Sequence, residues 1–155
     1  MTGSDVCSSD LSSTEINSRK LYKLVSVYVA APDHPIHLEA EPLSEVSRVK
    51  YRGIAVADTA RERPVLTVQL LDKQQRLTVS TIEEKRKALL AGLGVATMPY
   101  PMVEKDIEEG RLRVVSAEYN RETDIIMAWR RDSMGEAKAW FLREIPKLLA
   151  TREVK

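Results

Sequence analysis

Hydrophobic residues fall in short clusters along the chain, and most clusters have the length and composition of β-strands. Residues 21–31 (LYKLVSVYVAA) are rich in β-branched and aromatic side chains and stop at Pro32, which predicts a strand. The short apolar run at residues 53–57 (GIAVA) is typical of a buried strand. Four further segments have strand character: residues 64–71, 76–79, 111–115 and 124–129.

The clearest helix signal lies in the middle of the chain. Ser80 and Thr81 each precede a glutamate by three positions, at Glu83 and Glu84. Both spacings fit a capping box, in which the hydroxyl accepts from a free backbone N–H and the carboxylate reaches back. We therefore predict a helix over residues 82–91.

This helix belongs to a strand–helix–strand unit. Gly92 stands where a left-handed residue commonly ends a helix, and the apolar run at residues 94–98 (GVATM) predicts the next strand. The order predicts that residues 76–79 and 94–98 form parallel strands with a right-handed connection. Alternating strands and helices place the chain in the α/β class.

Three other helices are predicted. Pro42 suits the first position of a short helix at residues 42–46, and another helix covers residues 102–109. Residues 134–149 carry apolar side chains at helical spacing. Because Pro146 lies inside this last segment, we expect a kink there or an early 3₁₀-like finish.

Composition limits the classes of function. The 155 residues carry 24 lysines and arginines against 23 aspartates and glutamates, a net charge of +1, which argues against a large basic surface for nucleic acid. Aromatic residues make up 5%, too few for a platform that stacks single-stranded bases. The sequence has no apolar run near the roughly 20 residues of a membrane span and no signal-peptide pattern. We expect a cytoplasmic protein.

The residues that could carry chemistry are few. One cysteine, Cys7, forms no internal disulfide, and with only two histidines we expect no metal site and no cofactor. His34 and His37 lie among prolines, so we interpret them as solvated turn residues. Ser80, His34 and Asp33 could in principle form a nucleophile triad, but the G-x-S-x-G turn is missing. We expect no enzyme.

Acidic clusters at residues 83–84 and 104–109 lie on predicted helices beside lysines and arginines. We interpret them as solvated helix faces with i,i+4 ion pairs rather than as catalytic carboxylates.

Ser80 and Thr81 are the residues that most suggest ligand binding. At a strand-to-helix turn, free N–H groups and the positive end of the helix dipole can receive a carboxylate, phosphate or phenolate. The alternative is that both hydroxyls only cap the helix. The sequence leaves both interpretations open.

Residues 1–11 (MTGSDVCSSDL) are small and polar and have no periodicity. The run at residues 4–11 resembles one reading frame of a common sequencing-library adapter, so we interpret the segment as a non-native cloning or assembly scar. A natural flexible leader is the alternative. On the first interpretation, the coding sequence began upstream, and we expect the remaining chain to be the C-terminal piece of a longer protein.

Three motifs follow one another in the second half of the chain: residues 91–94 (AGLG) at a helix end, 98–99 (MP) at a strand end and 110–112 (GRL) after a helix. Upstream, residues 29–36 (VAAPDHPI) form a strand pattern followed by P-x-H-P. This order resembles the C-terminal part of the effector-binding domain of LysR-type transcriptional regulators. The resemblance covers about residues 21–149.

The resemblance implies an incomplete periplasmic-binding-protein-like (type 2) α/β fold, made of subdomain II plus a C-terminal remnant of subdomain I. Its implied divisions are residues 12–30 (end of subdomain I and crossover strand), 31–115 (subdomain II), 116–149 (return to subdomain I) and 150–155 (tail). Such domains bind a small effector in the cleft between the subdomains and form dimers or tetramers. They contact DNA only through an N-terminal domain, which we expect to be missing from this chain.

Carried over position by position, the effector-binding residues would be Asp58, Thr59, Ser80, Thr81, Met98 and Pro99. Each pair stands at the end of a predicted strand, where ligands bind in open α/β sheets. We expect a small, anionic or aromatic effector that controls transcription. The alternative is the small-molecule-binding lobe of a solute-binding protein of the same fold, which the lack of an export signal disfavours.

The last predicted helix would lack sheet partners in such a fragment. We therefore expect Trp140 and Phe141 to be exposed, and residues 123–149 to be partly disordered or prone to aggregation.

Overall fold

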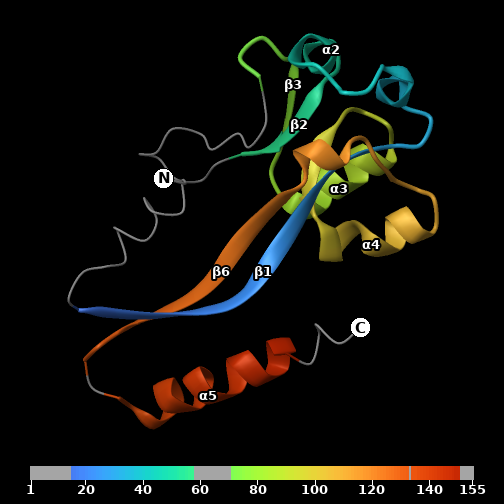
Figure 1. The fold of residues 1–155 in the computed structure, drawn as a ribbon. Helices are drawn as coiled ribbons and strands as arrows, with labels where there is room; N and C mark the ends of the chain where they lie inside the picture. The colour runs from blue at the N-terminus through green and yellow to red at the C-terminus, as the bar shows by residue number, and fades with distance from the viewer. Residues whose placement is uncertain (1–14, 58–70, 133, 151–155) are drawn as a thin grey trace. The chain divides into compact units, whose positions relative to one another are not determined.

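The structure is a computed structural model that describes residues 15–57, 71–132 and 134–150. The predicted strand at residues 64–71 lies outside the described residues except for its last position. In chain order the elements are β1 (Ile16–Ala30), η1 (Pro35–Leu38), α2 (Glu45–Val49), β2 (Gly53–Val56), β3 (Arg76–Val79), α3 (Ile82–Leu90), β4 (Ala96–Pro99), α4 (Tyr100–Glu108), β5 (Arg113–Val114), η2 (Ala117–Tyr119), β6 (Arg121–Arg130) and α5 (Glu136–Ala150) (Figure 1).

The long strand β1 organises the larger sheet. Its Val29 lies opposite Ala96 of β4 on one edge and Val114 of β5 on the other, antiparallel in both cases. Strand β6 also pairs with β1, and Figure 1 shows the two side by side. Because alternate residues of a strand point to opposite faces, Val27 and Val29 enter one core cluster, whereas their neighbours in β1 enter another. Both faces are therefore covered at this end of β1.

The strand–helix–strand unit contains a third strand between its two predicted strands. Strands β3 and β4 are not neighbours, because β2 lies between them. Strand β2 pairs with β3 in parallel, and Gly53 of β2 forms a parallel bridge with Val95, just before β4. Two hydrogen bonds of 2.9 Å hold this junction: Val95 N–H donates to Arg52 O, and Ile54 N–H donates to Val95 O. The predicted parallel direction is confirmed, and the sequence contained no prediction that β2 would lie between the two strands.

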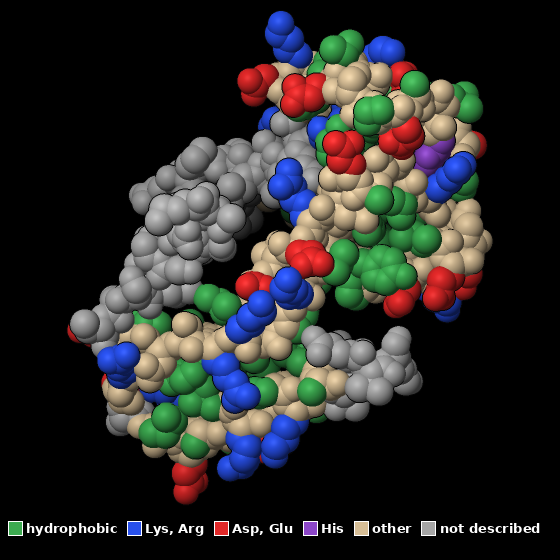
Figure 2. Space-filling view, in the orientation of Figure 1, with side chains coloured by type: hydrophobic (Ala, Val, Ile, Leu, Met, Phe, Trp, Pro, Cys, Tyr) green, Lys and Arg blue, Asp and Glu red, His purple; other side chains and the backbone are tan. Residues whose placement is uncertain are grey.

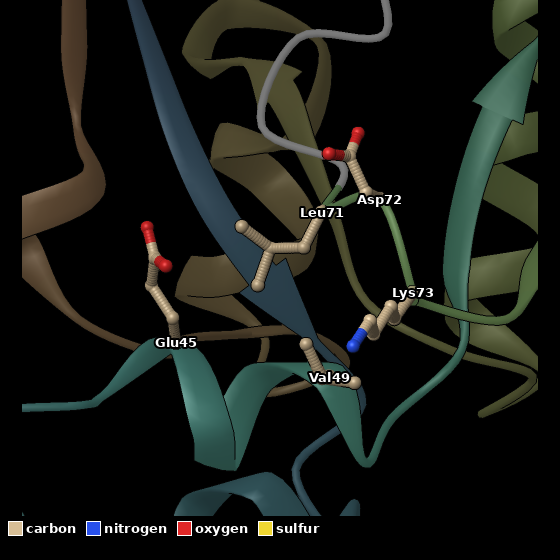
Figure 3. A pocket seen from close by; sticks show the side chains of 5 residues that line it. All are labelled: Glu45, Val49, Leu71, Asp72 and Lys73. Atoms are coloured by element: carbon tan, nitrogen blue, oxygen red, sulfur yellow. The ribbon is translucent and has the colours of Figure 1, made fainter.

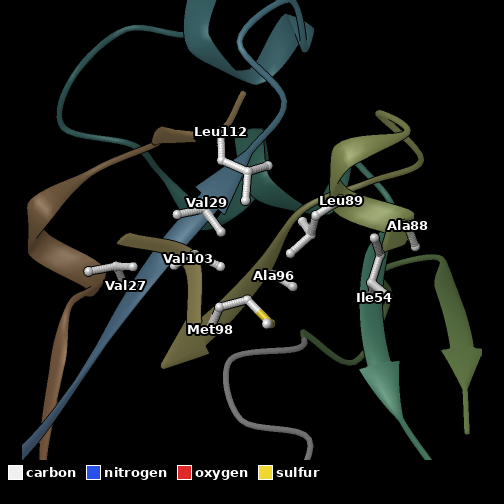
Figure 4. Packing of buried hydrophobic residues seen from close by; sticks show 9 residues of the cluster. All are labelled: Val27, Val29, Ile54, Ala88, Leu89, Ala96, Met98, Val103 and Leu112. Carbon is white, nitrogen blue, oxygen red and sulfur yellow. The ribbon is translucent and has the colours of Figure 1, made fainter. Parts of the chain in front are cut away.

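Helices α3 and α4 bury their apolar residues against strands β1, β2 and β4. Figure 4 shows side chains from β1, β2, α3, β4, α4 and the segment after α4 pointing toward one another. The members of this core cluster are Val27, Val29, Ile54, Ala88, Leu89, Ala96, Met98, Val103 and Leu112. A second cluster contains Tyr28, Ala30, Ile36, Leu43 and Val95.

Glycine ends both helices of this core. Gly92 after α3 and Gly110 after α4 each have φ +73°, the left-handed conformation that side chains disfavour. After α4, Gly110 N–H donates to Ile107 O and Arg111 N–H donates to Asp106 O, so the last carbonyls are satisfied. The helix end predicted at Gly92 is confirmed.

Two helix predictions need correction. Helix α2 begins at Glu45 rather than at Pro42, because Ser44 caps it: Ser44 Oγ accepts from the N–H of Ser47 at 3.1 Å. Helix α5 runs through Pro146 to Ala150, so the early 3₁₀-like finish is wrong. Among the described residues, we find no helix with the length and apolar character that a membrane span requires.

The chain divides into two compact units. Unit 1 comprises residues 1–24 and 123–155, and unit 2 comprises residues 25–122. Every buried hydrophobic residue in the described part of the chain lies in unit 2. In unit 1, Trp140 and Phe141 of α5 are 48% and 53% exposed, as expected for these two residues.

Candidate effector-binding site

The ends of β2 and β3 lie next to each other. Ala57 N–H donates to Val79 O at 2.8 Å, and Ser80 follows directly. The predicted pair Asp58 and Thr59 comes just after Ala57 but lies outside the described residues. The structure therefore describes four of the six residues predicted to bind an effector.

The turn from β3 into α3 is a helix cap. Thr81 Oγ1 accepts a hydrogen bond from the N–H of Glu84 at 3.1 Å, and Glu84 Oε2 accepts one from the N–H of Ser80 at 2.8 Å. The capping role of Thr81 and Glu84 is thus confirmed, although the carboxylate reaches Ser80 rather than Thr81. The second predicted box is wrong, because Glu83 pairs with Arg86 instead (Nη1 to Oε1, 3.2 Å).

Part of this helix end stays open. Ser80 and Thr81 are exposed. The hydroxyl of Ser80 and the N–H groups of Ile82 and Glu83 form no hydrogen bond with any described residue. The hydroxyl of Thr81 serves the cap, which leaves Ser80 and the first helical N–H groups as the donors available to a ligand.

Met98 and Pro99 are less accessible. The side chain of Met98 has no exposed surface and lies in the core cluster of Figure 4. It packs there because alternate residues of β4 point inward. A contact between Met98 and an effector would therefore have to use its backbone. Pro99 is half-buried and lies opposite Ser26 of β1. Among the described residues, no hydrogen bond links this pair to Ser80 or Thr81.

Lys85 is a residue near the turn that the sequence pattern did not single out. It lies one helical turn after Thr81, where i and i+4 positions share a face. Its side chain is half-buried, and burial lowers the pKa of its ammonium group. Its backbone N–H donates to Thr81 O at 3.1 Å, but its ammonium group forms no ion pair or hydrogen bond with any residue that the structure describes. The sequence offered only a weak indication of a role for Lys85, because this lysine lies within a run of charged residues.

The acidic residues of α4 are not all solvated. Asp106 is fully buried: Arg86 donates Nε to its Oδ2 at 2.7 Å and Nη2 to its Oδ1 at 2.8 Å, and Arg111 Nη2 donates to Oδ1 at 2.7 Å. Burial alone would raise the pKa of Asp106, but the two guanidinium groups outweigh it and hold that pKa below its usual range. The exposed pair of Lys105 and Glu109 does match the prediction. Asp106 therefore joins α3 to the end of α4.

His34 caps η1 and His37 lies within it, and neither histidine is simply solvated. His34 Nδ1 accepts the N–H of Ile36 at 3.2 Å, and His37 Nε2 lies 3.0 Å from Ala31 O. Both rings are half-buried, and burial lowers the pKa of each. In the described ranges, no group of three or more histidine, cysteine, aspartate and glutamate side chains is arranged to hold a metal.

An open depression lies elsewhere in unit 2. Its volume is about 410 Å³, and α2 and the segment before β3 line it with Glu45, Val49, Leu71, Asp72 and Lys73. Figure 3 shows these side chains around the hollow. None of the predicted effector-binding residues belongs to it.

Comparison with known proteins identifies the family. Residues 6–150 match the family model of the LysR substrate binding domain, and the chain therefore belongs to that family. It is 87% identical over 137 residues to the probable HTH-type transcriptional regulator YhaJ of Escherichia coli K12, covering 88% of this chain and 46% of the relative. It is 33% identical over 136 residues to the uncharacterized HTH-type transcriptional regulator YeeY of the same strain, covering 86% and 44%. The chain thus spans about half the length of these curated relatives.

Solved structures confirm the fold. The regulatory domain of HypT from Salmonella typhimurium superposes with a TM-score of 0.67 at 17% identity, over 92% of this chain and 69% of that one. The CrgA regulatory domain of Neisseria meningitidis gives 0.67 at 21% identity, over 90% and 71%. The fold is that of a LysR regulatory domain, which is α/β and periplasmic-binding-protein-like, and the chain covers about seven tenths of each neighbour.

Proposed function

We propose that this chain is the effector-sensing part of a LysR-type transcriptional regulator, which controls transcription in the cytoplasm and is not an enzyme. The family match over residues 6–150 carries this proposal. The whole protein would contact DNA through a separate N-terminal domain and act as a dimer or tetramer. Relatives described as HTH-type regulators, with which this chain shares about half their length, support that arrangement.

The effector in this proposal is a small anion, such as an aromatic acid, bound at the turn of Ser80 and Thr81. An anion suits this place for two reasons. The hydroxyl of Ser80 and the first N–H groups of α3 make no hydrogen bond with described residues, and a helix N-terminus attracts negative charge. The half-buried ammonium of Lys85, one turn further on, adds positive charge. Asp58, Thr59, Met98 and Pro99 remain proposed contacts.

The test uses a chimera in which residues 6–150 replace the matching segment of the full-length E. coli relative. Isothermal titration with benzoate and salicylate, and with neutral benzamide as the uncharged comparison, measures affinity. We expect the acids to bind and Ser80→Ala to weaken them by about tenfold or more, since a lost hydrogen bond to a charged group costs about 1.5–3 kcal/mol.

Two matched variants separate this result from general damage. Thr78→Ala removes an exposed hydroxyl from β3, two positions before Ser80, and Lys87→Met removes an exposed cation from α3. Both should leave affinity unchanged, whereas Lys85→Met should reduce it. Equal binding of acid and amide, or an unchanged affinity in Ser80→Ala, would contradict the proposed site. Loss of transcriptional control by the chimera with folding intact would contradict the proposed function itself.

A further inference from the structure

The corner that follows β1 is closed by two histidines. His34 N–H donates to Ala31 O at 3.0 Å, and His37 Nε2 lies 3.0 Å from the same oxygen. The ring of His34 turns back over the corner, so that its Nδ1 accepts the N–H of Ile36 at 3.2 Å and caps η1. Ile36 is 2% exposed and belongs to the second core cluster. The cap of His34 therefore holds the backbone of a core residue.

The two rings make opposite demands on protonation. Nδ1 of His34 can accept the hydrogen bond from the N–H of Ile36 only while that nitrogen carries no hydrogen of its own. A protonated ring would bring two N–H groups against each other and break the cap. His37 differs, because the partner of its Nε2 is a carbonyl oxygen, which needs a donor, and a protonated ring still donates.

We propose that His34 is an acid-sensitive switch, which closes the corner between β1 and η1 when its ring is neutral and opens it when the ring is protonated. This goes beyond effector binding, because it couples the packing of unit 2 to pH without any ligand.

The surroundings of His34 favour the neutral ring. Burial is the largest effect and lowers the pKa of His34. The neighbouring His37 lowers this pKa further, while Asp33 raises it. From the segment before β2, Tyr51 presents its ring to that of His34, with 5.3 Å between centroids. The hydroxyl of Tyr51 donates to Glu39 Oε1 at 2.7 Å, so its hydrogen is not available to the ring of His34.

Charges on other elements act less directly. Lys50, after α2, pairs with Glu39 at 3.2 Å, and among the described residues Tyr51 links this pair to the His34 ring. Arg113 of β5 lies close enough to His37 to lower the pKa of that ring. The ring of His37 is therefore also harder to protonate than a free imidazole. The experiment has to distinguish the effect of protonating His34 from that of protonating His37.

The direction of the pH effect follows from linkage. The pKa of His34 in the folded chain lies below its unfolded value of about 6.5. The stabilisation is therefore complete above about pH 6.5 and is lost as the pH falls below that value. Between pH 7.5 and 5.5 few carboxylates titrate, so histidine effects dominate this window.

Hydrogen exchange of the Ile36 amide, measured by NMR on the whole 155-residue chain, tests the switch. Protection factors, corrected for the intrinsic pH dependence of exchange, should fall between pH 7.5 and 5.5, by up to about tenfold, because a single histidine with an unfolded pKa of about 6.5 can contribute no more than that in this window. His34→Asn keeps an acceptor that suits a helix cap but does not titrate, so protection in this variant should be independent of pH. His37→Gln keeps an Nε2 donor, and its Ile36 amide should still lose protection in acid.

Two outcomes would overturn the proposal. One is an Ile36 amide whose protection does not change with pH in the parent chain. The other is a His34→Asn variant that loses protection as the parent does. A second measurement avoids any dependence on variants: imidazole ¹⁵N shifts of the unmodified chain should show Nδ1 of His34 unprotonated at pH 7.5, with its protonation following the same curve as the Ile36 amide shift. A protonated Nδ1 at pH 7.5 would also refute the switch.

Discussion

Replacement of Gly94 by alanine should be among the most damaging single changes in this chain. A Cβ at Gly94 would lie 2.3 Å from Arg52 O and 3.1 Å from Cγ1 of Ile54. Carbon and oxygen atoms in contact need about 3.5 Å, so the backbone at residue 94 would have to retreat by roughly 1 Å. The atom in the way is a backbone carbonyl, which cannot move aside as a flexible side chain could.

The retreat would also disturb the junction between β2 and β4. Val95 N–H donates to Arg52 O, the oxygen that the new Cβ would strike, and Ile54 N–H donates to Val95 O. Losing two hydrogen bonds costs about 1 kcal/mol each, and forcing a methyl group into a packed site costs about 1–3 kcal/mol. We expect Gly94→Ala to lower the free energy of unfolding by about 3–5 kcal/mol.

Urea denaturation, followed by circular dichroism, measures this loss as a lower midpoint at constant slope. Gly135→Ala is the matched control, because a Cβ there has no atom within 4 Å, and it should change stability by less than about 1 kcal/mol. If Gly94→Ala also loses less than about 1 kcal/mol, the close approach of Arg52 to residue 94 is not a feature of the folded protein.

Three further predictions concern other parts of the chain. Asp106→Ala should cost about 3 kcal/mol, because it removes the shared partner of Arg86 and a second arginine; a matched urea titration measures it. Since the pKa of Asp106 is lowered on folding, its contribution should be present above about pH 4 and lost as the pH falls further, which acid titration of the parent and the variant would reveal. Thr81→Ala should cost about 1 kcal/mol in thermal unfolding through loss of the cap. Hydrogen exchange should be faster in α5, which carries the exposed Trp140 and Phe141, than in α3; equal protection would contradict the weak packing of unit 1.

The sequence predicted those elements whose causes are local. The start of α3 depends on Thr81 and Glu84, three positions apart, and its end depends on Gly92, so a single stretch of sequence contains both signals. Strand β3 was predicted over its observed bounds, because its pattern also lies within a single stretch of sequence. The insertion of β2 between β3 and β4 depends on residues about forty positions apart, Gly53 and Val95, and periodicity carries no such information.

The candidate site was predictable to a similar extent. Ser80 and Thr81 could be placed at a strand-to-helix turn from local signals alone. The sequence predicted that Glu84 would reach back to this turn, but not that it would accept from the N–H of Ser80, nor that the side chain of Met98 would be buried. It also missed the burial of Asp106, because the arginines that make burial tolerable come from outside α4: Arg86 lies in α3 and Arg111 follows the helix.

The paired glycines of the A-G-x-G motif illustrate how one short pattern can meet two separate physical requirements. Gly92 is needed for its positive φ, and a Cβ there would meet only the Cβ of Ala31, at 3.8 Å. Gly94 has no such backbone conformation, and it is needed because the Arg52 carbonyl comes too close for any side chain. The first glycine ends α3, and the second lets the following strand join β2. At the other end of β2, Ala57 N–H donates to Val79 O, immediately before Ser80, so β2 links the strand that Gly94 allows to join it with the end of β3. A substitution at Gly94 should therefore weaken the proposed effector binding at Ser80, although residue 94 would not contact the ligand.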